Sequence, residues 1–425
     1  MKSRYGRIAG ILLSGLLIAS AIPAQAAEVQ NGAVYEVTTN QIPEWPQAPE
    51  IASETGILMD ADTGAILYNK GMDEIRYPAS ITKIMTCLLA LEQAGLDDQV
   101  TFTQTVLSDP NAGGTNIGMQ EGEILTMRQC LDVLMVQSAN DVATQIAEYV
   151  GGGSVQAFVD RMNERAQELG CTNTHFANAS GMPDENHYTT AHDMALIFQE
   201  AIKNETFLEI IKQQNVVIEP TNKNGETRTY SCHHALVAQS APEYYEGCFG
   251  GKTGVTEVAK NTLVSGVTRN GMTLIAVTLR AEVQQIYQDQ IKLFDYGFDN
   301  FTRAEVPGGF VTIPSDKTVE NLTIQETEEG TETIQKYYYN GEYYLGAGKK
   351  TEEEEVVLHA EEPVVTPESS DDAEKQKQDQ EMQEQQQSKV YKTVSYILAG
   401  LIGFAVITAV VSGIVKKKKK TSRKR

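Results

Sequence analysis

The chain has 425 residues, of which 57 are acidic and 35 are basic, and its formal net charge is −22 at pH 7. This length allows two or three domains, although enzymes of about 250 residues often fold as one unit. The negative charge argues against nucleic acid, or an anionic membrane surface, as the main partner of the folded part.

The first 26 residues are typical of an export signal. Basic residues at positions 2, 4 and 7 precede the apolar stretch IAGILLSGLLIASAI, and AQA follows with the small-x-small form of a cleavage site. An uncleaved anchor helix is the alternative, but the apolar core is short for a membrane span. The mature chain is expected to begin near Ala27.

Five cysteines and six histidines occur without metal-ligand spacing, so we expect no metal site and no cofactor. We interpret most of the cysteines as small buried hydrophobes. A disulfide between Cys232 and Cys248 is left open, because an exported protein meets oxidising surroundings.

Residues 45–302 mix strand and helix patterns. The stretch TGILMDADTGAILYNK predicts two strands joined at residues 62–64, and NTLVSGVTRNGMTLIAVTL predicts a hairpin that turns at Asn270-Gly271. The segments between them have apolar residues at three and four spacing and predict helices, as in SITKIMTCLLALEQAG and TAHDMALIFQEAIK. This order predicts an α/β fold of the α+β type, with one antiparallel sheet assembled from both ends of the block and flanked by helices.

Residues 303–350 predict a small β-rich domain without obvious chemistry, and the pair Asn340-Gly341 suits a tight hairpin. Residues 351–390 are acidic and rich in glutamine, which predicts a flexible tether.

Residues 393–415 contain no charged residue, and 23 apolar or small polar residues are enough to cross a membrane as a helix. The tail at 416–425, KKKKKTSRKR, has eight basic residues and is expected in the cytoplasm. A buried soluble helix is the alternative for 393–415. The pattern therefore predicts an exported protein anchored in the cell membrane, with its folded part outside.

The stretch PASITKIMT places Ser80 and Lys83 three residues apart at the start of a predicted helix, where both side chains share one face. A serine hydroxyl is a weak nucleophile that needs a base, and a lysine with a lowered pKa can be that base. Alone, the motif is also consistent with a helix-start serine and a solvated lysine.

Two further short motifs carry polar side chains. SAN, at 138–140, interrupts two helical patterns, and KTG, at 252–254, precedes the predicted hairpin on what we expect to be an edge strand. Each is also consistent with a purely structural role. SAN would then be a break between two helices, and KTG a polar end of a strand.

The order Ser-x-x-Lys, Ser-x-Asn, Lys-Thr-Gly is typical of penicillin-binding proteins and class A β-lactamases. The chain resembles the D-alanyl-D-alanine carboxypeptidases, the low-molecular-weight penicillin-binding proteins, across about residues 50–302. The stretches that carry this resemblance include ILMDADTGAILYNK, DVLMVQSANDVA, GCTNTHFANASGMPDENHYTTAHDMALI and GGKTGVTEVAKNTLVSGVTRNGMTLIAV. It implies a penicillin-binding-protein or β-lactamase-like transpeptidase fold for 45–302, with the small β domain appended.

The resemblance implies a serine peptidase mechanism. Ser80 would attack the carbonyl of the penultimate D-alanine of a peptidoglycan stem peptide, and Lys83 would accept its proton. Ser138 would relay a proton to the leaving amine. The backbone N–H groups of Ser80 and Val255 would form the oxyanion hole.

The resemblance also implies substrate-binding roles. Asn140 would hydrogen-bond the substrate backbone, Lys252 would lower the pKa of Lys83 and attract the substrate carboxylate, and Thr253 would hydrogen-bond that carboxylate. Gly254 lacks a side chain, so the substrate would lie against the strand.

The chain departs from the family pattern in three places. The segment AEVQQIYQDQIKLFDYGF lacks the arginine that many relatives use for the terminal carboxylate, and Arg280 is the nearest candidate. SGM at 180–182 and VAK at 258–260 replace the usual His-Gly-Leu and Ala-Gly.

The leading hypothesis is a membrane-tethered serine D-Ala-D-Ala carboxypeptidase, with peptidoglycan stem peptides as substrates and β-lactam antibiotics as inhibitors. One alternative is a β-lactamase-like hydrolase, for which Glu200 and Asn204 offer a Glu-x-x-x-Asn pattern that we interpret as coincidence. The other is a non-catalytic peptidoglycan-binding module.

Overall fold

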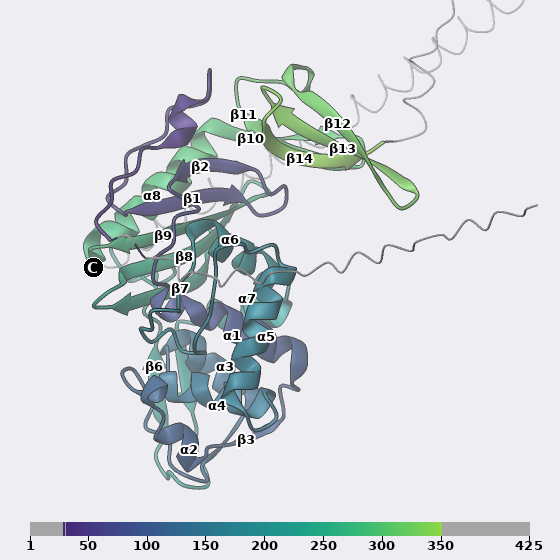
Figure 1. Cartoon of the computed structure of the whole chain (residues 1–425). Coiled ribbons are helices and arrows are strands. Elements are labelled where there is room, and N and C mark those ends of the chain that lie inside the picture. The colour runs from purple at the N-terminus through teal and green to yellow at the C-terminus, as the bar shows by residue number, and fades with distance from the viewer. Residues whose placement is uncertain (1–28, 30, 351–425) are drawn as a thin grey trace, which may run out of the picture. The chain divides into compact units, whose positions relative to one another are not determined.

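The computed structural model describes residues 29 and 31–350, and its first sheet has five antiparallel strands in the order β2-β1-β9-β8-β7 (Figure 1). These strands are β1 (Thr55–Asp60), β2 (Ile66–Lys70), β7 (Cys248–Thr256), β8 (Lys260–Arg269) and β9 (Met272–Ala281). Segments from the two ends of the block 45–302 therefore pair side by side. This confirms the predicted antiparallel sheet, and it makes β7 an edge strand.

The two predicted Asn-Gly turns are hairpins. Arg269 pairs with Met272, so the β8–β9 turn has two central residues, Asn270 at φ 52° and Gly271 at φ 78°. Positive φ at both central positions is the geometry that such turns need, and it is the reason for the Asn-Gly pair. Asn340 and Gly341 also have positive φ values, 51° and 77°, but they lie in a three-residue connection, because Tyr339 pairs with Tyr343.

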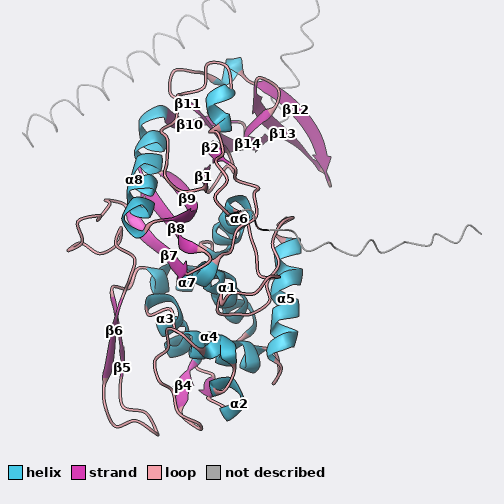
Figure 2. Ribbon diagram, turned by 60° about the vertical axis from the view of Figure 1, so that its left-hand side comes forward, coloured by secondary structure: helices cyan, strands magenta, loops and turns pink. Residues whose placement is uncertain are grey.

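Helices lie on both faces of the first sheet (Figure 2). Helix α8 (Val283–Asn300) packs on β8 and β9, and α6 (Ala191–Ala201) packs on β9 and β1 from the other face. The remaining helices join the α6 side, and they are α1 (Lys83–Gln93), α2 (Gln104–Leu107), α3 (Met127–Val136), α4 (Asn140–Val150), α5 (Val155–Glu168) and α7 (Glu205–Ile211). Two short hairpins accompany them, β3 (Gln99–Thr101) with β4 (Ile124–Thr126) and β5 (Asn215–Ile218) with β6 (Arg228–Ser231).

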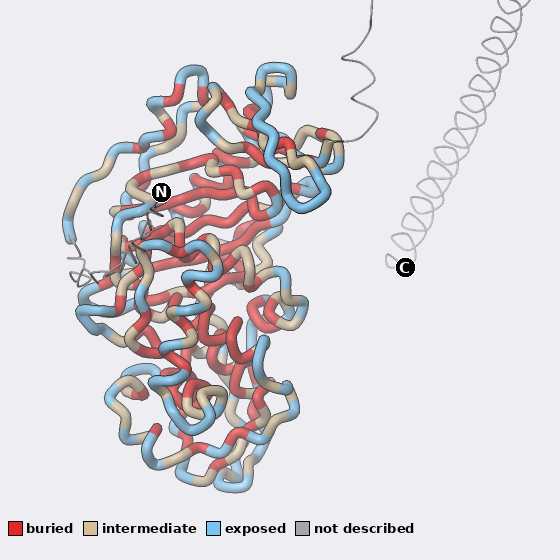
Figure 3. The backbone as a smooth tube through the Cα atoms, turned by 45° about the vertical axis from the view of Figure 1, so that its right-hand side comes forward, coloured by how far each residue is buried: buried red, intermediate tan, exposed pale blue. Residues whose placement is uncertain are grey.

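The sheet separates two hydrophobic cores because successive side chains of a strand point to opposite faces. Ile57 belongs to the core with the helices α1 and α3–α7, and its neighbour Leu58 belongs to the core under α8. All six residues of β1 are buried, as Figure 3 shows for the central strands. Covering both faces holds the strands of the first sheet, including β7 with the KTG motif, in fixed register.

A second antiparallel sheet follows α8, in the order β10-β11-β14-β13-β12. Its strands are β10 (Phe301–Val306), β11 (Gly309–Pro314), β12 (Thr323–Glu329), β13 (Glu332–Tyr339) and β14 (Tyr343–Lys349). Buried Asp60 links it to the first sheet, because its carboxylate accepts hydrogen bonds from Arg303 and from Thr312 Oγ1 (2.9 Å). All described residues belong to one compact unit.

Within residues 29 and 31–350, no helix combines the length and the apolar character that a membrane crossing needs. The predicted export signal at 1–26, tether at 351–390, membrane helix at 393–415 and basic tail at 416–425 lie outside the described residues.

Candidate active site

The predicted nucleophile lies in a strained turn. Ser80 belongs to the 3₁₀ turn Ala79–Thr82, which leads directly into α1. The preceding residue, Ala79, is buried and has φ 52°, in the left-handed region that costs a residue with a side chain about 1–2 kcal/mol. Such strain persists where surrounding contacts hold it, and it is characteristic of functional sites.

Lys83 is fully buried, and its Nζ meets three oxygen atoms. They are Ser80 Oγ at 3.0 Å, Asn140 Oδ1 at 2.6 Å and Ser180 O at 2.5 Å. Burial, followed by the positive charge of Lys252, holds the pKa of Lys83 well below its usual value. Both effects favour the neutral amine over the ammonium form.

A neutral amine has two N–H groups and one lone pair. The amide oxygen of Asn140 and the carbonyl oxygen of Ser180 are acceptors only, so they take the two N–H groups. In this neutral form the lone pair is left for Ser80 Oγ, 3.0 Å away, and the serine hydroxyl can donate its proton to it. This is the arrangement that general-base activation of a serine requires.

The SAN motif joins α3 to α4. Ser138 is buried and has φ 66°, and Asn140 is the first residue of α4. Asn140 Nδ2 donates to Gly113 O at 2.5 Å, so this side chain is fixed at both ends. Among the described hydrogen bonds, Asn140 contacts Lys83 directly and Ser138 does not contact Ser80 or Lys83.

The KTG motif lies on the edge strand β7, beside the nucleophile turn. Lys252 is buried, its Nζ donates to Thr253 O at 2.8 Å, and burial lowers its pKa to about 8. Val255, which follows the motif, has 67% of its surface exposed. The strand thus offers a cation and an open edge next to Ser80.

At position 254, the protein interior itself leaves no room for a side chain, which is not the explanation that the sequence suggested. A Cβ at this position would lie 2.8 Å from Ser80 N and 3.0 Å from Pro78 O, and it would overlap Thr262 Oγ1. Glycine therefore allows β7 to approach the backbone of the nucleophile turn closely. The required space is inside the protein, toward Ser80.

The loop at 178–182, whose SGM triplet was noted as a departure, is part of the site. Asn178 Oδ1 accepts hydrogen bonds from the backbone N–H groups of Ser180, Gly181 and Met182. This presents the carbonyl of Ser180 to Lys83. Sequence reasoning missed the contact because a backbone carbonyl has no sequence signature.

Asp141 was also missed, and it holds the loop that contacts Asn140. Its buried carboxylate accepts hydrogen bonds from the N–H groups of Ile117 (3.2 Å) and Met119 (3.4 Å). This loop supplies Gly113 O to the Asn140 side chain. An aspartate directly after SAN was the available signal.

Arg280 is engaged in an ion pair. Its Nε donates to Glu54 Oε1 at 2.8 Å, and its Nη1 donates to Val258 O. Glu54 also pairs with the buried Arg76 at 3.1 Å. The charge of Arg280, the predicted carboxylate-binding candidate, is therefore only partly compensated, because Glu54 is shared with Arg76.

All five cysteines are free thiols in the structure, so the disulfide left open between Cys232 and Cys248 is not formed. Cys232 Sγ instead accepts a hydrogen bond from His234 N at 3.4 Å. In the described part of the chain, no group of three or more His, Cys, Asp or Glu side chains is arranged to hold a metal ion.

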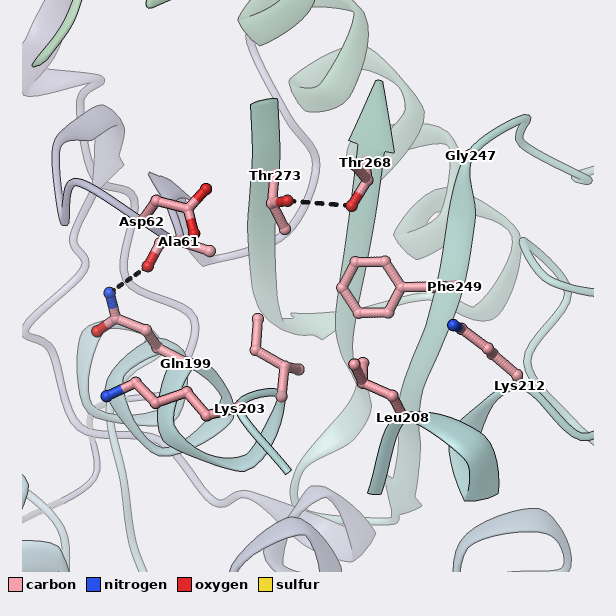
Figure 4. A pocket seen from close by; sticks show the side chains of 11 residues that line it. Ala61, Asp62, Gln199, Lys203, Leu208, Lys212, Gly247, Phe249, Thr268 and Thr273 are labelled. Atoms are coloured by element: carbon pink, nitrogen blue, oxygen red, sulfur yellow. Dashed lines mark hydrogen bonds between the residues drawn. The ribbon is translucent and has the colours of Figure 1, made fainter. Parts of the chain in front are cut away.

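A cavity of about 580 Å³ lies away from Ser80, between the helices α6 and α7 and the far ends of β7, β8 and β9 (Figure 4). Phe249 and Leu208 line it, with Lys203 and Lys212 at its sides. None of the predicted site residues lines this cavity. It is separate from the cluster around Lys83.

The comparisons with known proteins agree with this geometry. Residues 42–283 match the sequence profile of the family described as D-alanyl-D-alanine carboxypeptidase. The chain is 31% identical over 303 residues to the D-alanyl-D-alanine carboxypeptidase DacF of Bacillus subtilis (strain 168), covering 69% of this chain and 72% of that protein. It is 34% identical over 263 residues to the D-alanyl-D-alanine carboxypeptidase of Streptomyces sp. (strain K15), covering 59% of this chain and 88% of that protein.

Solved structures give the same relationship. The crystal structure of the Streptomyces K15 DD-transpeptidase matches with a TM-score of 0.56 at 32% sequence identity, covering 60% of this chain and 99% of that chain. This confirms the predicted fold class. The chain belongs to the D-alanyl-D-alanine carboxypeptidase family.

Proposed function

We propose that this chain removes the terminal D-alanine from peptidoglycan stem pentapeptides through an acyl-enzyme on Ser80, and that β-lactams acylate the same serine. The observation that carries the proposal is the environment of Lys83, a buried lysine with a lowered pKa and its Nζ 3.0 Å from Ser80 Oγ. Family membership supports the reaction class, a serine-type carboxypeptidase acting on cell-wall peptides.

In the acylation step, Ser80 Oγ attacks the carbonyl carbon of the penultimate D-alanine, and the hydroxyl proton moves to Lys83 Nζ. The charge on the carbonyl oxygen would be stabilised by the N–H groups of Ser80 and Val255. The C–N bond then breaks, and Ser138 relays the proton held by Lys83 to the departing amine, which returns Lys83 to its neutral form. Water hydrolyses the ester and restores Ser80.

Substrate binding would use the opposite wall of the site. Lys252 and Thr253 would hold the terminal carboxylate, and the Asn140 amide would contact the peptide backbone. The burial of Lys252 supports this role, because a cation in a low-dielectric setting attracts an anion more strongly than one in water. Arg280, already paired with Glu54, is a weaker candidate for the same carboxylate.

A β-lactamase would need a base for rapid deacylation. The carboxylate of Glu200 instead pairs with Lys203 (2.7 Å) and Arg165 (3.0 Å), and Asn204 caps α7. These contacts support the interpretation of Glu200 and Asn204 as structural residues. A non-catalytic module does not require a buried lysine with a lowered pKa beside a serine, which is the arrangement of Lys83 and Ser80.

Acylation of Ser80 by penicillin is expected to decrease above about pH 8. Lys252 carries its charge below its pKa of about 8 and loses it above, so attraction of the β-lactam carboxylate is lost as the pH rises. Replacing Lys252 with arginine, which stays charged, should remove this alkaline decrease. The second-order acylation constant, measured from about pH 6 to about pH 10, decides the matter. A decrease that persists unchanged in the arginine variant would assign it to another group.

We also propose that residues 393–415 anchor the protein in the membrane after export, with the basic tail in the cytoplasm. The uncharged stretch and the eight basic residues that follow it support this topology. Deleting residues 391–425 should move the protein from the membrane fraction to the soluble fraction. Equal membrane retention of the two forms would contradict the anchor.

The product assay tests the function itself. The purified full chain, incubated with a stem pentapeptide, should release one D-alanine per peptide, and penicillin should block this release. Adding an amine acceptor separates hydrolysis from transfer of the acyl group. A wild-type chain that binds the peptide but releases no D-alanine would support the non-catalytic alternative.

A further inference from the structure

His187 lies between the two backbone segments that flank Lys83. Its ring is buried, with Nε2 2.8 Å from Thr82 Oγ1 and Nδ1 3.1 Å from Ala177 N. Thr82 belongs to the nucleophile turn, and Ala177 begins the loop that presents Ser180 O to Lys83. One side chain thus contacts the support of the serine and the support of the lysine.

The hydrogen-bond partners define the tautomer of His187. The backbone N–H of Ala177 is a donor, so Nδ1 accepts and carries no proton. A neutral imidazole then has its proton on Nε2 and donates it to Thr82 Oγ1. Burial lowers the pKa of His187 to about 3, and this keeps the ring neutral. The charged or titratable groups around it are Asp184, His175 and Lys83.

Thr82 connects His187 to Ala79, the strained residue before Ser80. With its oxygen occupied by the His187 N–H, the threonine hydroxyl donates to Ala79 O at 2.9 Å. Ala79 is the residue with φ 52°, directly before Ser80. Without the histidine, the Thr82 hydroxyl would be free to rotate. With the histidine in place, the O–H of Thr82 points toward Ala79 O.

A second threonine acts on the preceding peptide. Thr262 Oγ1, from β8, donates to Pro78 O at 2.8 Å. Successive carbonyls before Ser80 are thus each fixed by a buried hydroxyl. Of these two hydroxyls, that of Thr82 also accepts a hydrogen bond from His187.

We propose that His187 is a positioning residue that acts through Thr82 to fix the peptide between Ala79 and Ser80, and so sets the direction of the Ser80 hydroxyl toward Lys83. The proposal rests on the proposed function, in which Ser80 is the nucleophile. His187 touches neither substrate nor reacting atoms. A purely structural histidine in the core is the competing explanation, and it predicts a loss of stability without a loss of rate per folded molecule.

Two substitutions of His187 separate its two contacts. In His187→Gln the amide nitrogen reaches about as far as Nε2 and preserves the donor to Thr82. His187→Asn preserves a partner for the Ala177 N–H but does not reach Thr82. Thr82→Ser retains the hydroxyl, and Thr82→Val removes it while conserving shape. Thr312→Val, which removes a buried hydroxyl from the second sheet, is the control for a general loss of stability.

The measurements are the penicillin acylation rate of the full chain, per folded molecule, and the unfolding temperature. We expect His187→Asn and Thr82→Val to acylate ~10-fold or more slowly, since small misplacements of reacting groups are costly. His187→Gln, Thr82→Ser and Thr312→Val should stay within about threefold of wild type. The slow variants should be slow at every pH without a change in the shape of the profile, because Lys83 is still the base.

The double variant Thr82→Val with His187→Asn provides an additional check. It should be no slower than Thr82→Val alone, because both changes break one chain of contacts. Wild-type rates in His187→Asn and Thr82→Val would overturn the positioning role even if both were destabilised. If Thr82→Val does not fold, the comparison of His187→Asn with His187→Gln decides alone. A wild-type chain that penicillin does not acylate would instead overturn the proposed function.

Discussion

Replacing Lys83 with methionine is expected to lower acylation of Ser80 by a factor of ~10³, within the range that a positioned general base contributes. The reason is geometric. In its neutral form, Lys83 donates its two N–H groups to Asn140 Oδ1 and Ser180 O, which leaves its lone pair for the serine proton. Methionine fills a similar volume without a base. The measurement is the acylation rate with a fluorescent penicillin.

Lys70 offers a matched control. It is also buried, its Nζ donates to Ile51 O and Ser53 O, and burial lowers its pKa. Lys70→Met should cost stability, because it leaves buried carbonyls without a donor, but acylation per folded molecule should not change. Acylation of Lys83→Met at the wild-type rate would show that another group takes the serine proton.

Gly181→Ala is expected to abolish acylation and to destabilise the fold by about 3 kcal/mol or more. Gly181 has φ 88°, and a Cβ there would overlap the Ala79 carbonyl and lie 3.0 Å from Ser80 N. The nucleophile turn or the 178–182 loop would have to move, and either movement separates Ser80 from Lys83. Thermal unfolding and acylation, measured on the same sample, test both effects.

Gly170→Ala separates backbone strain from this overlap. Gly170 has φ 83° but no heavy atom within 4 Å of a Cβ built on it. Its substitution should cost about 1 kcal/mol and leave acylation unaffected. Similar losses in the two alanine variants would refute the steric explanation and indicate backbone strain alone.

The sheet was predictable because its signals are local. The stretches TGILMDADTGAILYNK and NTLVSGVTRNGMTLIAVTL indicated the strands, and the pair Asn270-Gly271 indicated the hairpin through its need for positive φ. The spacing of Ser80 and Lys83 correctly predicted that the two side chains meet, since residues three apart share a helix face.

The support of the site was not predictable in the same way. Ser180 contributes a backbone carbonyl, and His187 acts across 105 positions of sequence on Thr82. Neither contact has a motif, because each depends on how the 178–182 loop folds over the nucleophile turn. The strain at Ala79 is equally invisible, since alanine has no preference for positive φ.

Gly254 has a structural role that the sequence did not suggest. The sequence suggested space for a substrate strand, whereas the structure reveals that a side chain would meet Ser80 N and Pro78 O. The roles of Ser138, Thr253 and Val255 stay predictions, because they concern a bound substrate.

The most direct test of the central claim is to locate the penicillin adduct. The purified full chain, treated with penicillin and digested, should yield a single acylated peptide by mass spectrometry, with the added mass on Ser80. The Ser80→Ala variant should yield none while it retains the wild-type unfolding temperature. An adduct on another residue, or an equal adduct in Ser80→Ala, would contradict the assignment of Ser80 as the nucleophile.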